Sequence, residues 1–185
     1  MNYKNNKLFI DNIKVDQIIR KINTPAYCYS FSKLKENILN FKESFKSINP
    51  LICFSVKSNS NVKILKEISN FGLGADVVSK GELIAALKSK IDPKKIVFSG
   101  VGKTGGEIEF AIKKKILLIN AESQSELIII SKIAKKMNKK VDVGLRLNPN
   151  VDAKTIKEIT TGKTSNKFGL SEKEFLELIK FCQKS

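Results

Sequence analysis

The sequence predicts an α/β fold in which helices cover a parallel β-sheet. Short runs rich in apolar and β-branched residues recur at nearly even spacing, and they occupy residues 52–56, 75–78, 96–98, 116–119 and 141–147. Between them, apolar residues return at three- and four-residue spacing, which is typical of amphipathic helices. Because parallel strands need crossover connections, and these are nearly always right-handed, the alternation favours a series of βα units.

Several of the expected helices begin with the same signal, a hydroxyl residue followed three positions later by glutamate. The pairs are Ser79 and Glu82, Thr104 and Glu107, Ser123 and Glu126, and Ser171 and Glu174. Each pair can satisfy backbone amides that have no partner at a helix N-terminus. The signal therefore predicts where each helix starts, whatever else these residues do.

The connection after the first strand helps to separate two parallel architectures, an open doubly wound sheet and a closed barrel. A dinucleotide-binding doubly wound sheet carries a GxGxxG turn there, but residues 57–60 read Lys-Ser-Asn-Ser. We therefore predict a (β/α)8 barrel of the TIM type. A complete barrel needs roughly 250 residues, so this chain of 185 residues is expected to hold a barrel truncated after about five βα units.

Composition excludes several kinds of site. The sequence contains no histidine, which rules out a Ser-His or Cys-His catalytic pair and a zinc-hydrolase site within it. Cys28, Cys53 and Cys182 lie far apart, and we expect them to be buried free thiols in a reducing compartment. No apolar stretch approaches the ~20 residues of a membrane span, and no signal-peptide core is evident. We expect a soluble, cytoplasmic protein with no membrane partner and no metal.

The formal net charge of +16 would suit a nucleic-acid ligand, but its distribution does not. Arg20 and Arg146 are the only arginines, and the lysines are scattered along the chain. A nucleic-acid-binding surface instead gathers basic residues on one helix or arm. We therefore expect solvated surface lysines and no nucleic-acid partner. The alternative, a basic module, predicts salt-sensitive affinity for DNA.

Lys57 is the candidate catalytic residue. It follows the first predicted strand directly, and in a βα barrel the carboxyl ends of the strands form the catalytic face. Partial desolvation beside apolar strand residues would favour the neutral amine that reacts with an aldehyde cofactor. In a chain with so many lysines, this position by itself carries little weight.

Blocks of sequence that follow one another along the chain add to this interpretation. They are residues 24–30 (TPAYCYS), 54–59 (FSVKSN), 74–83 (GADVVSKGEL), 98–104 (FSGVGKT), 119–123 (INAES), 145–151 (LRLNPNV), and 161–163 (TGK) with 167–169 (KFG). Together they resemble the fold-type III pyridoxal-phosphate decarboxylases, and within them the diaminopimelate decarboxylases most closely. Ser55 stands where this family more often has alanine, and Ser58 where alanine or cysteine is common, and the cofactor lysine motif around Lys57 is otherwise kept.

The resemblance implies a fold and a set of site residues. Residues 31–185 would form part of a pyridoxal-phosphate-binding barrel of the alanine racemase-like type, and residues 1–30, with TPAYCYS as an opening strand, would belong to a β-domain. Lys57 would hold the cofactor, and Asp76 and Arg146 would lie near it. Arg146 interrupts an apolar strand, so we expect an anionic partner, with Asp76 as the candidate. Asp76 as an exposed turn residue is the alternative.

The resemblance also implies an activity. The full-length protein would convert meso-2,6-diaminopimelate into L-lysine with pyridoxal 5'-phosphate, acting on a small amino acid as a homodimer. The family's remaining cofactor and substrate residues lie beyond residue 185, so this chain alone would be an inactive fragment. Residues 148–170 would lie over the barrel mouth. Open alternatives are an ornithine, arginine or carboxynorspermidine decarboxylase, and a non-catalytic pyridoxal-phosphate-binding barrel protein.

Overall fold

The computed structural model describes residues 1–152, 154 and 168–183. Contacts divide the chain into two compact units, Met1–Pro50 and Leu51–Ser185. The expected blocks at 161–163 and Lys167, and most of the segment 148–170, lie outside the described residues. The predicted domain boundary after residue 30 stays a prediction.

The N-terminal unit consists of a small antiparallel sheet and two helices. Strands β1 (Asn2–Lys4), β2 (Lys7–Ile10) and β3 (Ile13–Lys14) pair in sequence order and are followed by helices α1 (Val15–Ile19) and α2 (Phe31–Ser44). In the turn before β3, Asp11 accepts hydrogen bonds from the hydroxyls of Ser30 and Ser32. These bonds lower the pKa of Asp11 to about 2 and tie the turn to the start of α2.

The strand expected at TPAYCYS is wrong for this chain. Residues 26–30 have no regular secondary structure, and the antiparallel strands lie earlier, between residues 2 and 14. A strand forms only where another strand satisfies its backbone groups, and none of the described residues pairs with this segment. The family resemblance suggested the strand, and a resemblance within one segment does not supply a pairing partner.

The second unit contains the predicted parallel sheet. Its strands are β4 (Cys53–Ser55), β5 (Gly74–Val77), β6 (Ile96–Phe98), β7 (Leu118–Ala121) and β8 (Val143–Leu145). They are all parallel and lie in sequence order, β4-β5-β6-β7-β8. A doubly wound sheet reverses its strand order at a switch point, whereas a barrel does not. The order therefore confirms the barrel-type α/β fold, of which the described residues supply five strands.

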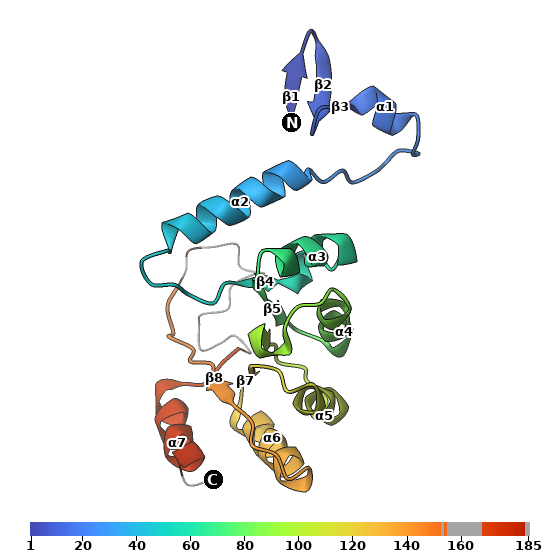
Figure 1. Ribbon diagram of the computed structural model, residues 1–185. Helices are drawn as coiled ribbons and strands as arrows, with labels where there is room; N and C mark the ends of the chain where they lie inside the picture. The colour runs from blue at the N-terminus through green and yellow to red at the C-terminus, as the bar shows by residue number, and fades with distance from the viewer. Residues whose placement is uncertain (153, 155–167, 184–185) are drawn as a thin grey trace. The chain divides into compact units, whose positions relative to one another are not determined.

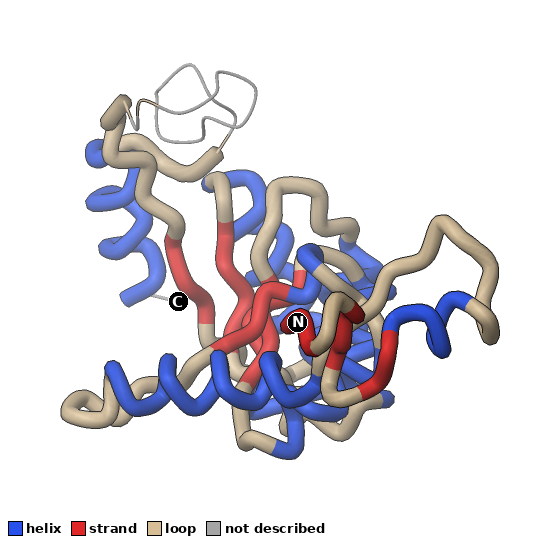
Figure 2. The backbone as a smooth tube through the Cα atoms, turned by 90° about the horizontal axis from the view of Figure 1, so that it is seen from above, coloured by secondary structure: helices blue, strands red, loops and turns tan. Residues whose placement is uncertain are grey.

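Helices follow the strands in turn. They are α3 (Val62–Asn70), α4 (Lys80–Lys88), α5 (Gly105–Lys114), α6 (Gln124–Lys136) and α7 (Glu172–Gln183), with short 3-10 turns η1 (Val56–Ser58) and η2 (Pro93–Lys95). Helices α3 to α6 run along one side of the sheet, each against the next (Figure 1). Helix α7 lies next to β8 at the end of the sheet (Figures 1 and 2).

The core of this unit lies between the sheet and helices α3 to α6. Its fully buried large side chains include Leu65 and Ile68 on α3, Leu83 on α4, Ile96 and Phe98 on β6, Ile108 on α5, Ile119 on β7 and Ile130 on α6. Burial of each such side chain contributes roughly 1.5–3 kcal/mol. Backbone packing is equally close at Gly74, where an added Cβ would lie 2.1 Å from the carbonyl oxygen of Lys95.

The cysteines differ from the expectation of buried thiols. Cys28 and Cys182 are exposed, and Cys53 is half-buried. Burial and the nearby charge of Asp76 raise the pKa of the Cys53 thiol. Among the described residues, no helix combines the length and apolar character that crossing a membrane requires.

The helix-start signals predicted from the sequence act in two ways. At α5, Thr104 and Glu107 form a reciprocal capping box, and Ser171 and Glu174 do the same before α7. At α4 and α6, serine caps the helix, but Glu82 and Glu126 accept hydrogen bonds from the residue before the cap. These two carboxylates therefore fix the strand ends as well as the helix starts.

Glu107 should stabilise the fold in a pH-dependent way. Its carboxylate accepts hydrogen bonds from the backbone N–H groups of Lys80, at 2.9 Å, and Thr104, at 3.0 Å. These bonds lower the pKa of Glu107, and the bond from Lys80 has the larger effect. A carboxylate whose pKa is lower in the folded than in the unfolded protein stabilises the fold at pH values above its unfolded pKa. This stabilisation is lost as the pH falls through the folded pKa. Glu107→Gln should therefore cost about 1 kcal/mol at pH 7, and the difference should shrink below roughly pH 4.

Urea unfolding of the two proteins between pH 3 and 7 measures this difference. Glu177→Gln, an exposed change on α7, is the control and should alter stability little at any pH. A loss of equal size at pH 3 and pH 7 would show that the charge of Glu107 does not act.

Candidate active site

A cavity of about 700 Å³ lies at the carboxyl ends of the five parallel strands. Its polar lining includes Lys57, Asp76, Ser99, Asn120, Glu122 and Arg146. Each strand contributes at least one of these side chains, from its last residues or the residues just after it. This is the face on which a βα barrel carries its catalytic groups, so the fold brings together all three site residues predicted from the sequence.

Lys57 is held by the short turn η1 at the end of β4. Val56 before it is fully buried, the Ser58 hydroxyl donates to the carbonyl of Ser55 at 2.7 Å, and the Asn59 N–H donates to the carbonyl of Val56 at 3.0 Å. The Lys57 side chain is nevertheless exposed, where the sequence predicted partial desolvation. The turn places it at the open mouth of the cavity instead of among the apolar residues of the strand.

Asp76 is part of a hydrogen-bonded row that crosses three neighbouring strands. The hydroxyl of Ser99 donates to Asp76 Oδ1 at 2.6 Å, and Asn120 Nδ2 donates to the Ser99 oxygen at 3.0 Å. Asp76 lies within β5 and is half-buried, so the alternative of an exposed turn residue is wrong. The row fixes the direction in which its carboxylate faces the cavity.

Arg146 has an anionic partner, as expected, but the partner is Glu122 and not Asp76. Its Nη1 lies 3.0 Å from both carboxylate oxygens of Glu122. The sheet order explains the correction, because Glu122 follows β7, the neighbour of β8, whereas Asp76 lies on β5. The backbone N–H of Arg146 donates to Ala121 at 3.1 Å, which brings the two strand ends together.

Sequence reasoning assigned no role to Ser99, Asn120 or Glu122. All three lie in blocks that carried the family resemblance, and each lies at or just after the end of a predicted strand. The sequential strand order of a barrel places these three residues beside Asp76 and Arg146. The strand order expected from the sequence could therefore have identified them as site residues.

The side chains present fit a pyridoxal cofactor. The cavity offers an amine that can react with an aldehyde, a carboxylate, and a guanidinium that binds anionic oxygens, and its volume lies within the range of small-molecule sites. The Phe168 ring lies 4.9 Å from the guanidinium of Arg146 and gives this side of the cavity an aromatic wall.

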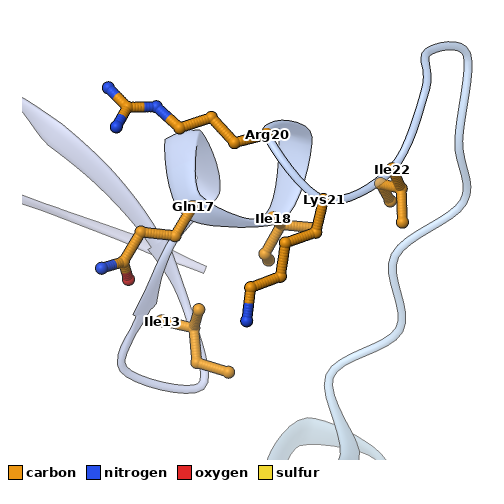
Figure 3. Close-up of a pocket in the computed structure, with 6 residues that line it drawn as sticks. All are labelled: Ile13, Gln17, Ile18, Arg20, Lys21 and Ile22. Atoms are coloured by element: carbon orange, nitrogen blue, oxygen red, sulfur yellow. The ribbon is translucent and has the colours of Figure 1, made fainter.

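A second hollow, of about 490 Å³, lies in the N-terminal unit. Ile13, Gln17, Ile18, Arg20, Lys21 and Ile22 line it, and Figure 3 shows the Arg20 guanidinium extending away from the Lys21 amine. The lining holds two cations and no carboxylate, so it offers no acid-base pair for catalysis.

Comparison with known proteins identifies the family. Residues 31–185 match the model of the pyridoxal-dependent decarboxylases, pyridoxal binding domain. The chain belongs to this family. Lys57, Asp76 and Arg146 all lie within the residues that match this domain.

Individual relatives agree with this assignment. The chain is 49% identical over 170 residues to the diaminopimelate decarboxylase of Helicobacter pylori strain J99, covering 92% of this chain and 42% of the relative. A crystal structure of the Helicobacter pylori enzyme complexed with L-lysine superposes with a TM-score of 0.90 at 47% identity, over 92% of this chain and 43% of that one. The enzyme from M. jannaschii in complex with L-lysine also gives 0.90, at 36% identity over 98% and 44%. The chain therefore spans about two fifths of the length of its relatives.

Ser99 should be the link that holds the Asp76 row together. Ser99→Ala removes both of its hydrogen bonds and leaves Asp76 and Asn120 with one partner fewer, so we expect a loss of about 1–3 kcal/mol in the free energy of unfolding. Denaturant unfolding measures it. Ser60→Ala, at an exposed hydroxyl, is the matched control. Equal stability of the two variants would contradict a structural role for the row.

Proposed function

We propose that the whole protein is a pyridoxal-phosphate-dependent decarboxylase that converts meso-2,6-diaminopimelate into L-lysine. The observation that carries the proposal is the gathering of Lys57, Asp76 and Arg146 around one cavity at the strand ends. The similarity to diaminopimelate decarboxylases over nearly the whole chain supports it. The relatives whose structures hold L-lysine support an amino-acid ligand of this size and charge.

Each site residue has a distinct role in this proposal. Lys57 would hold the cofactor, because its amine lines the cavity and an amine can react with an aldehyde. Arg146 binds an anionic oxygen, and Asp76, oriented by Ser99, faces the same cavity. When bound, pyridoxal phosphate accepts the electron pair released as the bond to the substrate carboxylate breaks.

The proposal extends to the organisation of the protein. Residues 31–185 belong to the barrel and residues 1–30 to a β-domain, the whole protein acts as a homodimer in the cytoplasm, and further site residues come from outside this chain. Because this chain spans about two fifths of its relatives, we propose that it has little or no activity by itself. A measured turnover by the 185-residue chain would contradict this part.

The activity is tested by carbon dioxide release from meso-2,6-diaminopimelate by the whole protein. Lys57→Ala should lower kcat/KM on the order of 1,000-fold or more, because it removes the amine that binds the cofactor. Lys66→Ala, at an exposed lysine on α3, is the matched control and should behave as the parent.

Two outcomes would contradict the proposal. Release from L-ornithine or L-arginine but not from diaminopimelate would reject the substrate. Undiminished turnover by Lys57→Ala would reject the role of this lysine.

A further inference from the structure

Two buried carboxylates lie beside the cavity, one in its wall and one next to that residue. Glu122, at the end of β7, is 4% exposed, and Glu126, in the first turn of α6, is 8% exposed. A buried carboxylate is costly unless a cation and hydrogen-bond donors compensate its charge. The arrangement of these compensating groups shows what the two residues do.

Glu126 is compensated by a lysine whose side chain is entirely buried. Lys103, in the loop between β6 and α5, has a fully buried side chain and places Nζ 2.8 Å from Glu126 Oε1. The two groups form an ion pair, but their geometry is not that of a hydrogen bond to Glu126 Oε1. The same ammonium donates to the carbonyl of Gly100 and lies 5.7 Å from the centre of the Phe98 ring. Lys103 therefore packs as part of the core and is not among the residues that line the cavity.

The other oxygen of Glu126 anchors Glu122. Glu126 Oε2 accepts the backbone N–H of Glu122 at 2.7 Å, which fixes the residue at the end of β7. The Glu122 carboxylate then accepts the N–H of Gly100 at 3.1 Å and the Nη1 of Arg146 at 3.0 Å. One buried network thus joins the loop after β6, the end of β7 and the end of β8.

This network leaves part of the Arg146 guanidinium available to a ligand. Glu122 contacts only Nη1, and a guanidinium has five N–H donors. Among the described residues, no other group forms a hydrogen bond or ion pair with this guanidinium. The Arg146 side chain is 39% exposed and lines the cavity with Lys57. Nε and Nη2 can therefore bind an anionic oxygen while Nη1 stays fixed.

We propose that Glu122 is a positioning residue, which holds the guanidinium of Arg146 in the direction needed to bind an anionic oxygen of the pyridoxal cofactor. It acts through Arg146 and does not itself touch the cofactor. The Lys103–Glu126 pair supports it by fixing its backbone. This inference rests on the proposed function, because it concerns the same cavity.

A double-mutant cycle on the whole protein tests this. The equilibrium affinity for pyridoxal phosphate is measured by absorbance titration in the parent, Glu122→Gln, Arg146→Met and the variant with both changes. Each single change should weaken binding about tenfold, and the double variant should bind no more weakly than Arg146→Met, because residues that act as a unit are not additive. A residue with a purely structural role would not give this coupling.

Two further variants keep the test decisive. Glu122→Asp keeps the charge and should recover part of the affinity, and it replaces Glu122→Gln in the cycle if the amide variant does not fold. Glu174→Gln, at the exposed capping glutamate of α7, should bind the cofactor as the parent does.

The outcomes separate the inference from the function on which it rests. Additive losses, or an unchanged affinity in Glu122→Gln, would overturn the inference alone. A parent that binds no pyridoxal phosphate would overturn the proposed function and this inference with it.

Discussion

The sequential order of the parallel strands is the constraint on which the site depends. In an unbroken parallel sheet every strand ends at the same edge, so residues far apart in the chain arrive side by side. Lys57 and Arg146 follow the first and last strands of the sheet, yet both line one cavity. Helices α3 to α6 pack against the sheet and hold this edge in place.

Charge balance at this edge decides which residues can bind a ligand. The chain carries a formal charge of +16, but each of the two buried carboxylates at the cavity has one cation and one backbone amide as partners. Glu126 has Lys103 and the amide of Glu122, and Glu122 has Arg146 and the amide of Gly100. Lys103 is fully buried in this balance, whereas Arg146 keeps donors that face the cavity. Of these two cations, Arg146 is therefore the one that can meet an anion.

Much of this arrangement could be predicted from local sequence. Strand β6 lies where its apolar run was expected, and Ser79, Thr104 and Ser123 begin their helices, because side-chain capping and apolar periodicity act over a few residues. Lys57 was identified from its place after the first strand together with the family resemblance of the blocks around it.

What could not be predicted depended on partners distant in the sequence. The partner of Arg146 required the order of the strands, which separates β5 from β8. A strand at residues 24–30 required a neighbouring strand to pair with. The exposure of Lys57 required knowing how the turn η1 leaves β4. In each case the local sequence and the family resemblance did not specify the partner or the path of the chain on which the outcome depended.

The most direct test of the central claim is to add pyridoxal phosphate to the purified protein, reduce with borohydride and map the modified lysine by mass spectrometry. If the strand ends build a pyridoxal site around Lys57, one label per chain should form at this residue, although many other lysines are exposed. Labelling spread over many lysines, or its absence at Lys57, would contradict the account.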